Sequence, residues 1–367
     1  MRFPEFQGKW EKCKLGDYGK VVTGNTPPTK DIENYENGTY LWASPADLGT
    51  IKLISETKTM LSAKGFSKTR ALPKGSVLVT CIGSTIGKTG MATKEMSTNQ
   101  QINSIVVNDN SDNDFVYYAI QSAFPRYLSS IAVQAVPIIS KSAFELLPNQ
   151  RPCLQEQKKI GKMLSLLDER IATQNKIIED LKRLKSAISH ILFSSKGAIH
   201  LSEIANVVMG QSPSSNAYND QGLGMPLVQG NLDISNGKTT PRLYTAEFNQ
   251  TTEKGNIILT VRAPVGEVAK ATQKVCLGRG VCAIIPHEEN MSDFIYQYLT
   301  FYKFMWRRYE QGSTFTSING SDVRNIFCPK VRNVSILTLL DIKINIEERV
   351  VKQYQSQKQY MLYQMFI

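Results

Sequence analysis

Cysteine and histidine are scarce in this sequence, and their spacing disfavours the sites that they commonly build. The 367 residues include six cysteines without a C-x-x-C pair and three histidines without the spacing of metal ligands. They are Cys13, Cys81, Cys153, Cys276, Cys282 and Cys328, with His190, His200 and His287. We therefore expect no disulfide framework and no zinc site, but free thiols in a reducing cytoplasm.

Long apolar runs and an excess of acidic residues are also missing. No stretch of eighteen apolar residues occurs, and residues 1–10 lack the apolar core of a signal peptide, so we expect a cytoplasmic protein without a membrane partner. The net charge of +11 favours a polyanion as partner, although a merely basic soluble protein has the same balance. The hydrophobic content of 41% is sufficient for two separate cores.

The motifs that carry catalysis are defective. Residues 83–89 resemble a phosphate-binding loop, but three residues separate the glycines where that loop needs four. Residues 156–158 have the E-x-K pattern of many nucleases without a suitably placed second carboxylate, and residues 26–29 lack the acceptor and aromatic ring of a base methyltransferase. We therefore predict no enzyme, no catalytic residue and no metal ligand. The loop at 83–89 is predicted either to let the backbone approach DNA or to be a plain turn.

The two halves of the sequence resemble each other. Blocks of the first half return in the same order in the second half, with an offset that falls slowly as short deletions would make it fall. Residues 21–24 return at 207–210, residues 75–80 at 255–260, residues 114–117 at 293–296, and residues 164–168 at 337–341. This order predicts an internal duplication.

Each half has the same plan. A mixed segment of about 140 residues comes first, with short β-rich runs such as 77–82 and 102–107 and a shorter helix at 114–122 or 293–304. A long helix closes each half. We predict an α+β fold with two mixed β-rich domains and two long helices, arranged about an approximate two-fold axis.

The long helices carry matching apolar seams. Residues 155–193 contain no proline, and apolar positions recur at alternating steps of three and four. The pairing residues of the first helix are Leu164, Leu167, Ile171, Ile178, Leu181, Lys185 and Ile188, and those of the second are Leu337, Leu340, Ile344, Glu347, Val351 and Tyr354. We expect the two helices to form an antiparallel coiled coil.

Polar residues interrupt both seams at equivalent positions. Gln174 and Lys185 in the first seam correspond to Glu347 and Lys358 in the second. We predict that Lys185 lies opposite Glu347 and Gln174 opposite Lys358, which would set the register. The alternative is that these residues are ordinary defects facing water.

Several segments resemble one known family. Residues 147–148, 154–160 and 166–171 look like the start of a spacer helix, residues 22–28 like an opening strand and loop, and residues 82–88 and 99–102 like interior patterns. Together with the duplication, they make the chain similar to the specificity subunits of type I restriction-modification enzymes. The second half departs from the pattern, because no E-Q-K-K-I segment follows Pro329. We expect the second helix to be shorter at its N-terminal end.

The resemblance implies a division of labour along the chain. Residues 1–153 and 198–330 would be target-recognition domains that each read half of a bipartite double-stranded DNA site, and residues 154–197 and 331–367 would be the spacer helices. It also implies two modification (methyltransferase) subunits and a restriction (endonuclease and translocase) subunit as partners in a bacterial or archaeal cytoplasm. S-adenosylmethionine, ATP and Mg would be cofactors of those partners only.

Base readout needs hydrogen-bonding side chains on loops. We predict such contacts for Thr26, Lys30, Ser44, Lys64, Lys68, Arg70, Ser84, Thr85, Lys88 and Gln100 in the first domain, and for Gln211, Ser212, Gln229, Asn231, Arg262 and Arg279 in the second. Each could equally be a solvated surface residue. Two rival functions are an independent nuclease or NTPase, which the defective motifs disfavour, and a coiled-coil scaffold, which leaves the two large mixed domains unexplained.

Overall fold

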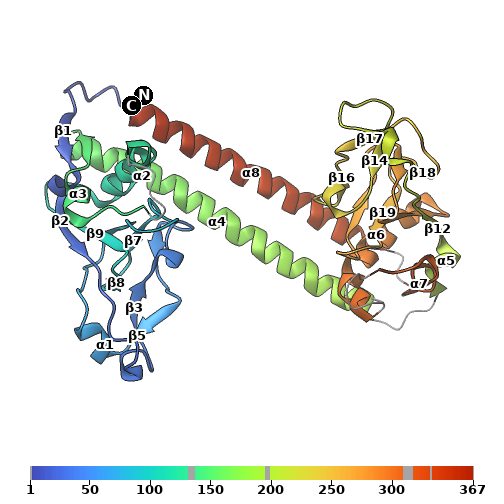
Figure 1. Ribbon diagram of the computed structural model, residues 1–367, viewed down its shortest axis with the longest axis horizontal. Helices are drawn as coiled ribbons and strands as arrows, with labels where there is room; N and C mark the ends of the chain where they lie inside the picture. The colour runs from blue at the N-terminus through green and yellow to red at the C-terminus, as the bar shows by residue number, and fades with distance from the viewer. Residues whose placement is uncertain (1, 131–136, 195–198, 309–316, 331–332, 367) are drawn as a thin grey trace. The chain divides into compact units, whose positions relative to one another are not determined.

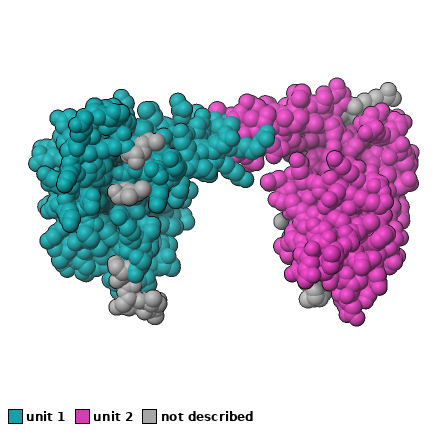
Figure 2. Space-filling model, turned by 90° about the horizontal axis from the view of Figure 1, so that it is seen from above, with its two compact units in different colours: residues 1–175, 349–367 teal, residues 176–348 magenta. Residues whose placement is uncertain are grey.

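The computed structural model describes residues 2–130, 137–194, 199–308, 317–330 and 333–366. It divides into two compact units, one of residues 1–175 and 349–367 and the other of residues 176–348 (Figure 2). Unit 1 therefore contains the last turns of the chain, and unit 2 contains the end of the first long helix. Each unit is described by itself.

Unit 1 is built on a five-stranded sheet. Its order is β2 (Gly19–Thr23), β9 (Ile102–Val107), β6 (Val77–Thr80), β7 (Thr89–Ala92) and β4 (Leu53–Ile54). A three-stranded sheet joins β5 (Thr59–Leu61), β3 (Tyr40–Ala43) and β8 (Ser97–Thr98), and β1 (Glu11–Lys14) pairs with β10 (Pro148–Arg151). The helices α1 (Ala63–Ser67), α2 (Asn113–Ser130) and α3 (Lys141–Glu145) complete the unit (Figure 1).

Unit 2 repeats the central sheet with the same neighbours. The order is β12 (Ala205–Met209), β22 (Val281–Pro286), β19 (Ile257–Thr260), β20 (Val268–Lys270), β16 (Lys238–Thr239) and β15 (Ile234–Ser235). A second sheet contains β13 (Tyr218–Asn219), β17 (Leu243–Thr245), β14 (Met225–Val228), β21 (Val275–Leu277) and β18 (Thr251–Thr252), and β11 (Ile199–His200) pairs with β23 (Phe327–Cys328). Its helices are α5 (Leu201–Ile204), α6 (Ser292–Tyr302) and α7 (Gly320–Arg324). The predicted duplication is confirmed.

Both central sheets are buried on two faces, which explains why their strands are continuously apolar. Val77 and Val79 of β6 belong to the core that contains α2, whereas Leu78 belongs to the core under β3. Ile257 and Ile258 of β19 divide in the same way between the α6 core and the core beside β21. A strand covered on both faces reads as an apolar run rather than as an alternating pattern.

The two long helices are α4 (Leu154–Phe193) and α8 (Ser335–Met365). The 40 residues of α4 form one unbroken helix about 60 Å long at ~1.5 Å per residue (Figure 1). Ser335 is equivalent to Lys162, so α8 starts eight residues later than α4 in the repeat (162 − 154). The shorter second helix is confirmed, because α8 begins only at Ser335.

The helices pack antiparallel, and all thirteen predicted pairing residues are buried or half-buried. In unit 1 Lys358 Nζ lies 2.7 Å from Asp168 Oδ1, and in unit 2 Lys185 Nζ lies 2.6 Å from Asp341 Oδ1. The two pairs are equivalent in the repeat, because Lys358 corresponds to Lys185 and Asp341 to Asp168, both at an offset of 173. The predicted register, with Lys185 facing Glu347 and Gln174 facing Lys358, is therefore wrong. The prediction considered only seam positions, whereas both aspartates stand directly after a seam leucine and still reach the lysines.

The same aspartates tie the helices to the mixed domains. Tyr118 of α2 donates a hydrogen bond to Asp168 Oδ2 at 2.5 Å, and Gln297 of α6 donates one to Asp341 Oδ2 at 2.7 Å. Tyr118 and Gln297 are themselves equivalent, at an offset of 179. Each unit therefore contains a three-residue polar junction between α4, α8 and its own domain helix.

Candidate nucleic-acid interface

In unit 1, several predicted contact residues meet around Asn25. Its backbone N–H donates to Thr98 at 2.9 Å, its side-chain amide donates to the Lys68 carbonyl at 2.8 Å, and its side-chain oxygen accepts the Arg70 N–H at 3.0 Å. The loop after β2 is thereby joined to the loop after α1 and to the end of β8. Thr26, Arg70 and Gln100 are gathered at one end of the unit.

Two further contacts extend this surface. Thr26 Oγ1 donates a hydrogen bond to Gln100 Oε1, and the Arg70 guanidinium donates to the Thr23 carbonyl at 2.6 Å. The Cys81 N–H donates to the Gln101 carbonyl at 2.7 Å, so the loop with the exposed Ser84 adjoins the same edge. Thr26, Arg70, Ser84 and Gln100 therefore form the candidate surface of unit 1, in which Arg70 is the one charged side chain.

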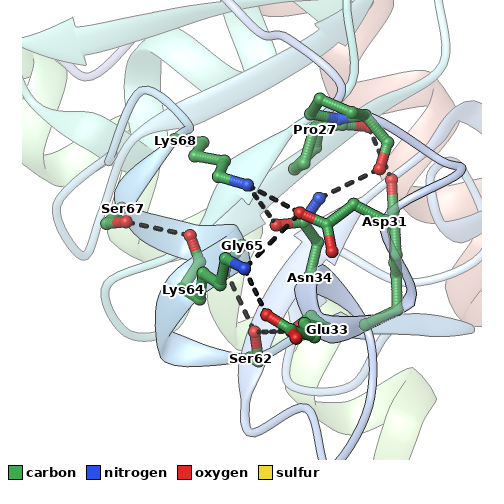
Figure 3. A network of polar contacts seen from close by, with 11 residues as sticks. Pro27, Asp31, Glu33, Asn34, Ser62, Lys64, Gly65, Ser67 and Lys68 are labelled. Atoms are coloured by element: carbon green, nitrogen blue, oxygen red, sulfur yellow. Dashed lines mark hydrogen bonds and ion pairs between the residues drawn. The ribbon is translucent and has the colours of Figure 1, made fainter.

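The ammonium groups of Lys64 and Lys68 belong to a polar network at α1 (Figure 3). Lys64 Nζ pairs with Glu33, and Lys68 Nζ lies 3.0 Å from Asp31 Oδ2 and 2.7 Å from Asn34 Oδ1. The hydrogen bond from Lys68 is the main reason why the pKa of Asp31 is lowered. A phosphate would have to compete with two carboxylates for these ammonium groups, so the structure favours a local structural role.

The remaining unit 1 candidates do not join the Asn25 surface in any contact among the described residues. The Ser44 N–H and hydroxyl both donate to Asp47 Oδ2, at 2.8 and 2.7 Å, and fix the turn after β3. Lys30 and Lys88 are exposed, and Thr85 is half-buried.

In unit 2, five of the six predicted residues line one hollow of about 370 Å³. They are Ser212, Gln229, Asn231, Arg262 and Arg279, and Gln211 is exposed outside it. The Arg279 N–H donates to Ser212 Oγ at 3.1 Å. Ser212 and Arg279 are equivalent to Thr26 and Gln100, so the two units join the same pair of loops.

Arg242 also lines this hollow, although it was not among the predicted contact residues. It precedes β17 in a stretch for which we found no matching block in the first half, so the duplication gave no reason to select it. Its Nε donates to Asp233 Oδ1 at 3.0 Å, while Asp233 Oδ2 accepts the Gln229 N–H at 2.8 Å. Three arginines and one buried aspartate therefore surround the unit 2 hollow.

The glycine loops are shaped by packing. Gly87 and Gly266 have φ angles of +89°, and a Cβ would lie 2.6 Å from Phe124 in the first case and 2.3 Å from Trp306 in the second. These loops are turns whose last glycine makes room for an aromatic ring. The plain-turn alternative is therefore favoured at Gly87.

The side chains that could suggest chemistry have structural partners. Glu156 of the E-x-K segment is fully buried and accepts two hydrogen bonds from Arg2, at 2.7 and 2.6 Å. Burial raises the pKa of the Cys81, Cys282 and Cys328 thiols to about 12, which keeps them protonated at neutral pH. Among the described residues, no group of three or more His, Cys, Asp or Glu could hold a metal ion.

Each unit also has a hollow beside its long helices. In unit 1 it has about 970 Å³ and lies between Gln121, Ser122 and Pro125 of α2 and Gln359, Leu362 and Tyr363 of α8. In unit 2 it has about 480 Å³. One side is lined by Thr300, Phe301 and Phe304, and the other by Ser186, Ser189 and His190 of α4. These twelve residues are equivalent one to one, at offsets of 179 and 173.

Within the described part of the chain, no helix is long and apolar enough to cross a membrane.

Both halves of the chain are similar to known proteins of one family. A family model described as type I restriction modification DNA specificity domain matches residues 7–183 and 197–353. The MjaX protein of Methanocaldococcus jannaschii, named as a type I restriction enzyme specificity subunit, is 32% identical over 226 residues, which cover 56% of this chain and 53% of that protein. The HindI specificity subunit of Haemophilus influenzae is 32% identical over 126 residues, covering 34% and 27%. The chain thus spans about half or less of the length of these relatives.

Two solved structures share the fold. The crystal structure of a type I restriction-modification system S subunit from M. genitalium aligns with a TM-score of 0.68 at 20% identity, covering 98% of this chain and 96% of that one. A chain from a study of complex assembly and conformational transition of the type I R-M system aligns with a TM-score of 0.60 at 21% identity, covering 97% of both chains.

Proposed function

The chain belongs to the type I restriction-modification DNA specificity family, and on this basis we propose that it selects a bipartite DNA target for a larger modification and restriction complex. Each unit reads one half-site through its loop surface. The observation that carries the proposal is the equivalence of these surfaces, in which the same loops are joined through Thr26 and Gln100 in unit 1 and through Ser212 and Arg279 in unit 2. Equivalent frames with different side chains are what two different half-sites require.

The proposal assigns no chemistry to the chain itself. The carboxylate and thiols nearest to a catalytic pattern are committed to packing and ion pairs. Methylation and cleavage would belong to modification and restriction subunits, together with S-adenosylmethionine, ATP and Mg. The compartment would be a bacterial or archaeal cytoplasm.

Two modification subunits would dock at the helical part of the chain. The hollows beside α2 and α6 support this stoichiometry, because equivalent residues line both of them. A partner that recognises one can recognise the other. Apolar side chains such as Phe304 and Tyr363, which are mostly exposed, supply area for such contacts.

The test is DNA binding by the full chain assembled with its modification subunits. We expect salt-dependent binding that is specific for one two-part sequence, and methylation that is lost when the chain is omitted. Assembly without any salt-sensitive DNA binding would contradict the proposal and favour the scaffold alternative. Metal-dependent cleavage by the isolated chain would instead favour an independent nuclease.

A further inference from the structure

The loop surfaces of the two units differ in charge at equivalent positions. Gln100 and Ile82 of unit 1 correspond to Arg279 and Arg262 of unit 2, both of which line the hollow. Arg242 adds a third guanidinium there. Against the one carboxylate of Asp233, the hollow therefore has a net charge of +2 (three arginines and one aspartate).

The aspartate at the floor of the hollow has an equivalent in unit 1, and the comparison shows what is special about Arg242. Asp47 uses one oxygen to fix the turn after β3 and the other to accept the backbone N–H of Lys58 at 2.9 Å. Asp233 fixes the corresponding turn with one oxygen, but its other oxygen accepts the Arg242 side chain. A backbone donor in one unit is replaced by a guanidinium in the other.

This contact orients the guanidinium without enclosing it. The Asp233 side chain is 4% exposed, whereas that of Arg242 is 57% exposed. The bond uses Nε, so the two terminal nitrogens remain available as a pair of donors. Among the described residues, neither Arg262 nor Arg279 has a carboxylate within 4.0 Å, so both add positive charge without competing for Asp233.

We propose that the unit 2 hollow reads a guanine, with Arg242 as the specificity-determining side chain and Asp233 as its positioning residue; the inference rests on the proposed DNA-reading function. A guanine presents N7 and O6 in the major groove, and an arginine fork is the side chain that meets both acceptors. An oriented arginine loses less freedom when it forms the two bonds. The half-site of unit 2 then contains a G·C pair.

The experiment is methylation mapping by long-read sequencing in cells that express the full chain with its modification subunits. The unit 2 half-site is first identified as the half that changes when the variable segment of that unit is exchanged. Wild type, Arg242→Gln and Asp233→Asn are then compared, with Lys274→Gln as control. Lys274 is an exposed residue of unit 2 that pairs with Glu253 and lies outside the hollow.

We expect Arg242→Gln to relax one G·C position of that half-site, so that methylation at sites with another base there rises roughly ten- to hundredfold relative to wild type. Asp233→Asn should relax the same position less, because Arg242 keeps its charge but loses its fixed orientation. The other half-site and Lys274→Gln should be unchanged. Relaxation at one base distinguishes positioning from misfolding, which would lower methylation at all sites.

Two results would overturn the inference while the proposed function stands. One is a unit 2 half-site without a required G·C pair. The other is a uniform loss of methylation across all sites in Arg242→Gln, which would make Arg242 a phosphate contact. Absence of any bipartite motif would overturn the proposed function as well, so the two failures can be told apart.

Discussion

At the residue scale, two glycines of unit 2 have nearly the same backbone conformation but different surroundings. Gly266 has a φ angle of +89°, and a Cβ there would lie 2.3 Å from the Trp306 ring, whereas Gly255 has a φ angle of +90° and no atom within 4 Å of the position of a Cβ. Gly266→Ala should therefore cost more than Gly255→Ala, by about 1–3 kcal/mol of unfolding free energy, because overpacking adds to the backbone strain that both share. Urea denaturation of both variants measures the difference. Equal costs would mean that the ring yields to the added methyl group.

Thiol reactivity is a second residue-scale prediction. Cys153 is exposed, whereas the other five cysteines are buried. Iodoacetamide at pH 8 should alkylate Cys153 first, and the others only in denaturant, as peptide mass spectrometry would reveal. Early modification of Cys282, whose pKa is raised to about 12 by burial, would contradict the described core.

Asp293 gives a prediction for acid stability. Its pKa is lowered, mainly by the hydrogen bond from Lys270, with Thr338 donating a second one at 3.2 Å. A carboxylate whose pKa is lower in the folded state stabilises the fold above its unfolded pKa of about 3.9 and loses this contribution as pH falls through the folded value.

Wild type should therefore lose more unfolding free energy than Asp293→Asn between pH 5 and pH 3. The difference should stay under about 1 kcal/mol because the pair is partly exposed. Urea denaturation at both pH values provides the measurement. An equal loss of unfolding free energy in the two proteins would show that the ion pair contributes nothing.

At the element scale, the helix pair depends on polar junctions that the seam pattern does not reveal. The period of three and four predicted both helices, because seam spacing is a local property of the sequence. The ion-pair partners could not be predicted in this way, since Asp168 and Asp341 lie beside the seam and their reach depends on the crossing of the helices. The strands of the central sheets were predicted from β-rich segments. The second sheet of each unit could not be predicted, because its strands are only two to four residues long.

The junction in unit 2 supports a double-mutant cycle. Lys185→Ala, Asp341→Ala and the double variant should give a coupling energy of about 0.5–3 kcal/mol, because the side chains are only 18% and 31% exposed. The more exposed Lys182–Glu348 pair of the same helices serves as control and should give about 1 kcal/mol or less. Equal coupling energies in the two cycles would show that the Lys185–Asp341 pair stabilises the helix pair no more than an exposed ion pair does.

At the scale of the whole molecule, the duplication could be found from the sequence because equivalent blocks recur in order. Five residues that line the unit 2 hollow, among them Ser212, Arg262 and Arg279, were among the predicted contacts because their side chains can form hydrogen bonds and were expected in loops. Arg242 could not be found, because the stretch that carries it has no matched block in the first half. The paired state of Lys64 and Lys68 was equally hidden, since it depends on Asp31 and Glu33, which lie some thirty residues away in the chain.

The central claim is that each unit reads one half of a two-part DNA site. The most direct measurement is methylation mapping after residues 1–150 are exchanged for the corresponding segment of another specificity subunit, in cells that also supply the modification subunits. The account predicts that one half of the methylated motif changes while the other half keeps its sequence. A change in both halves, or a continuous motif that ignores the exchange, would contradict it.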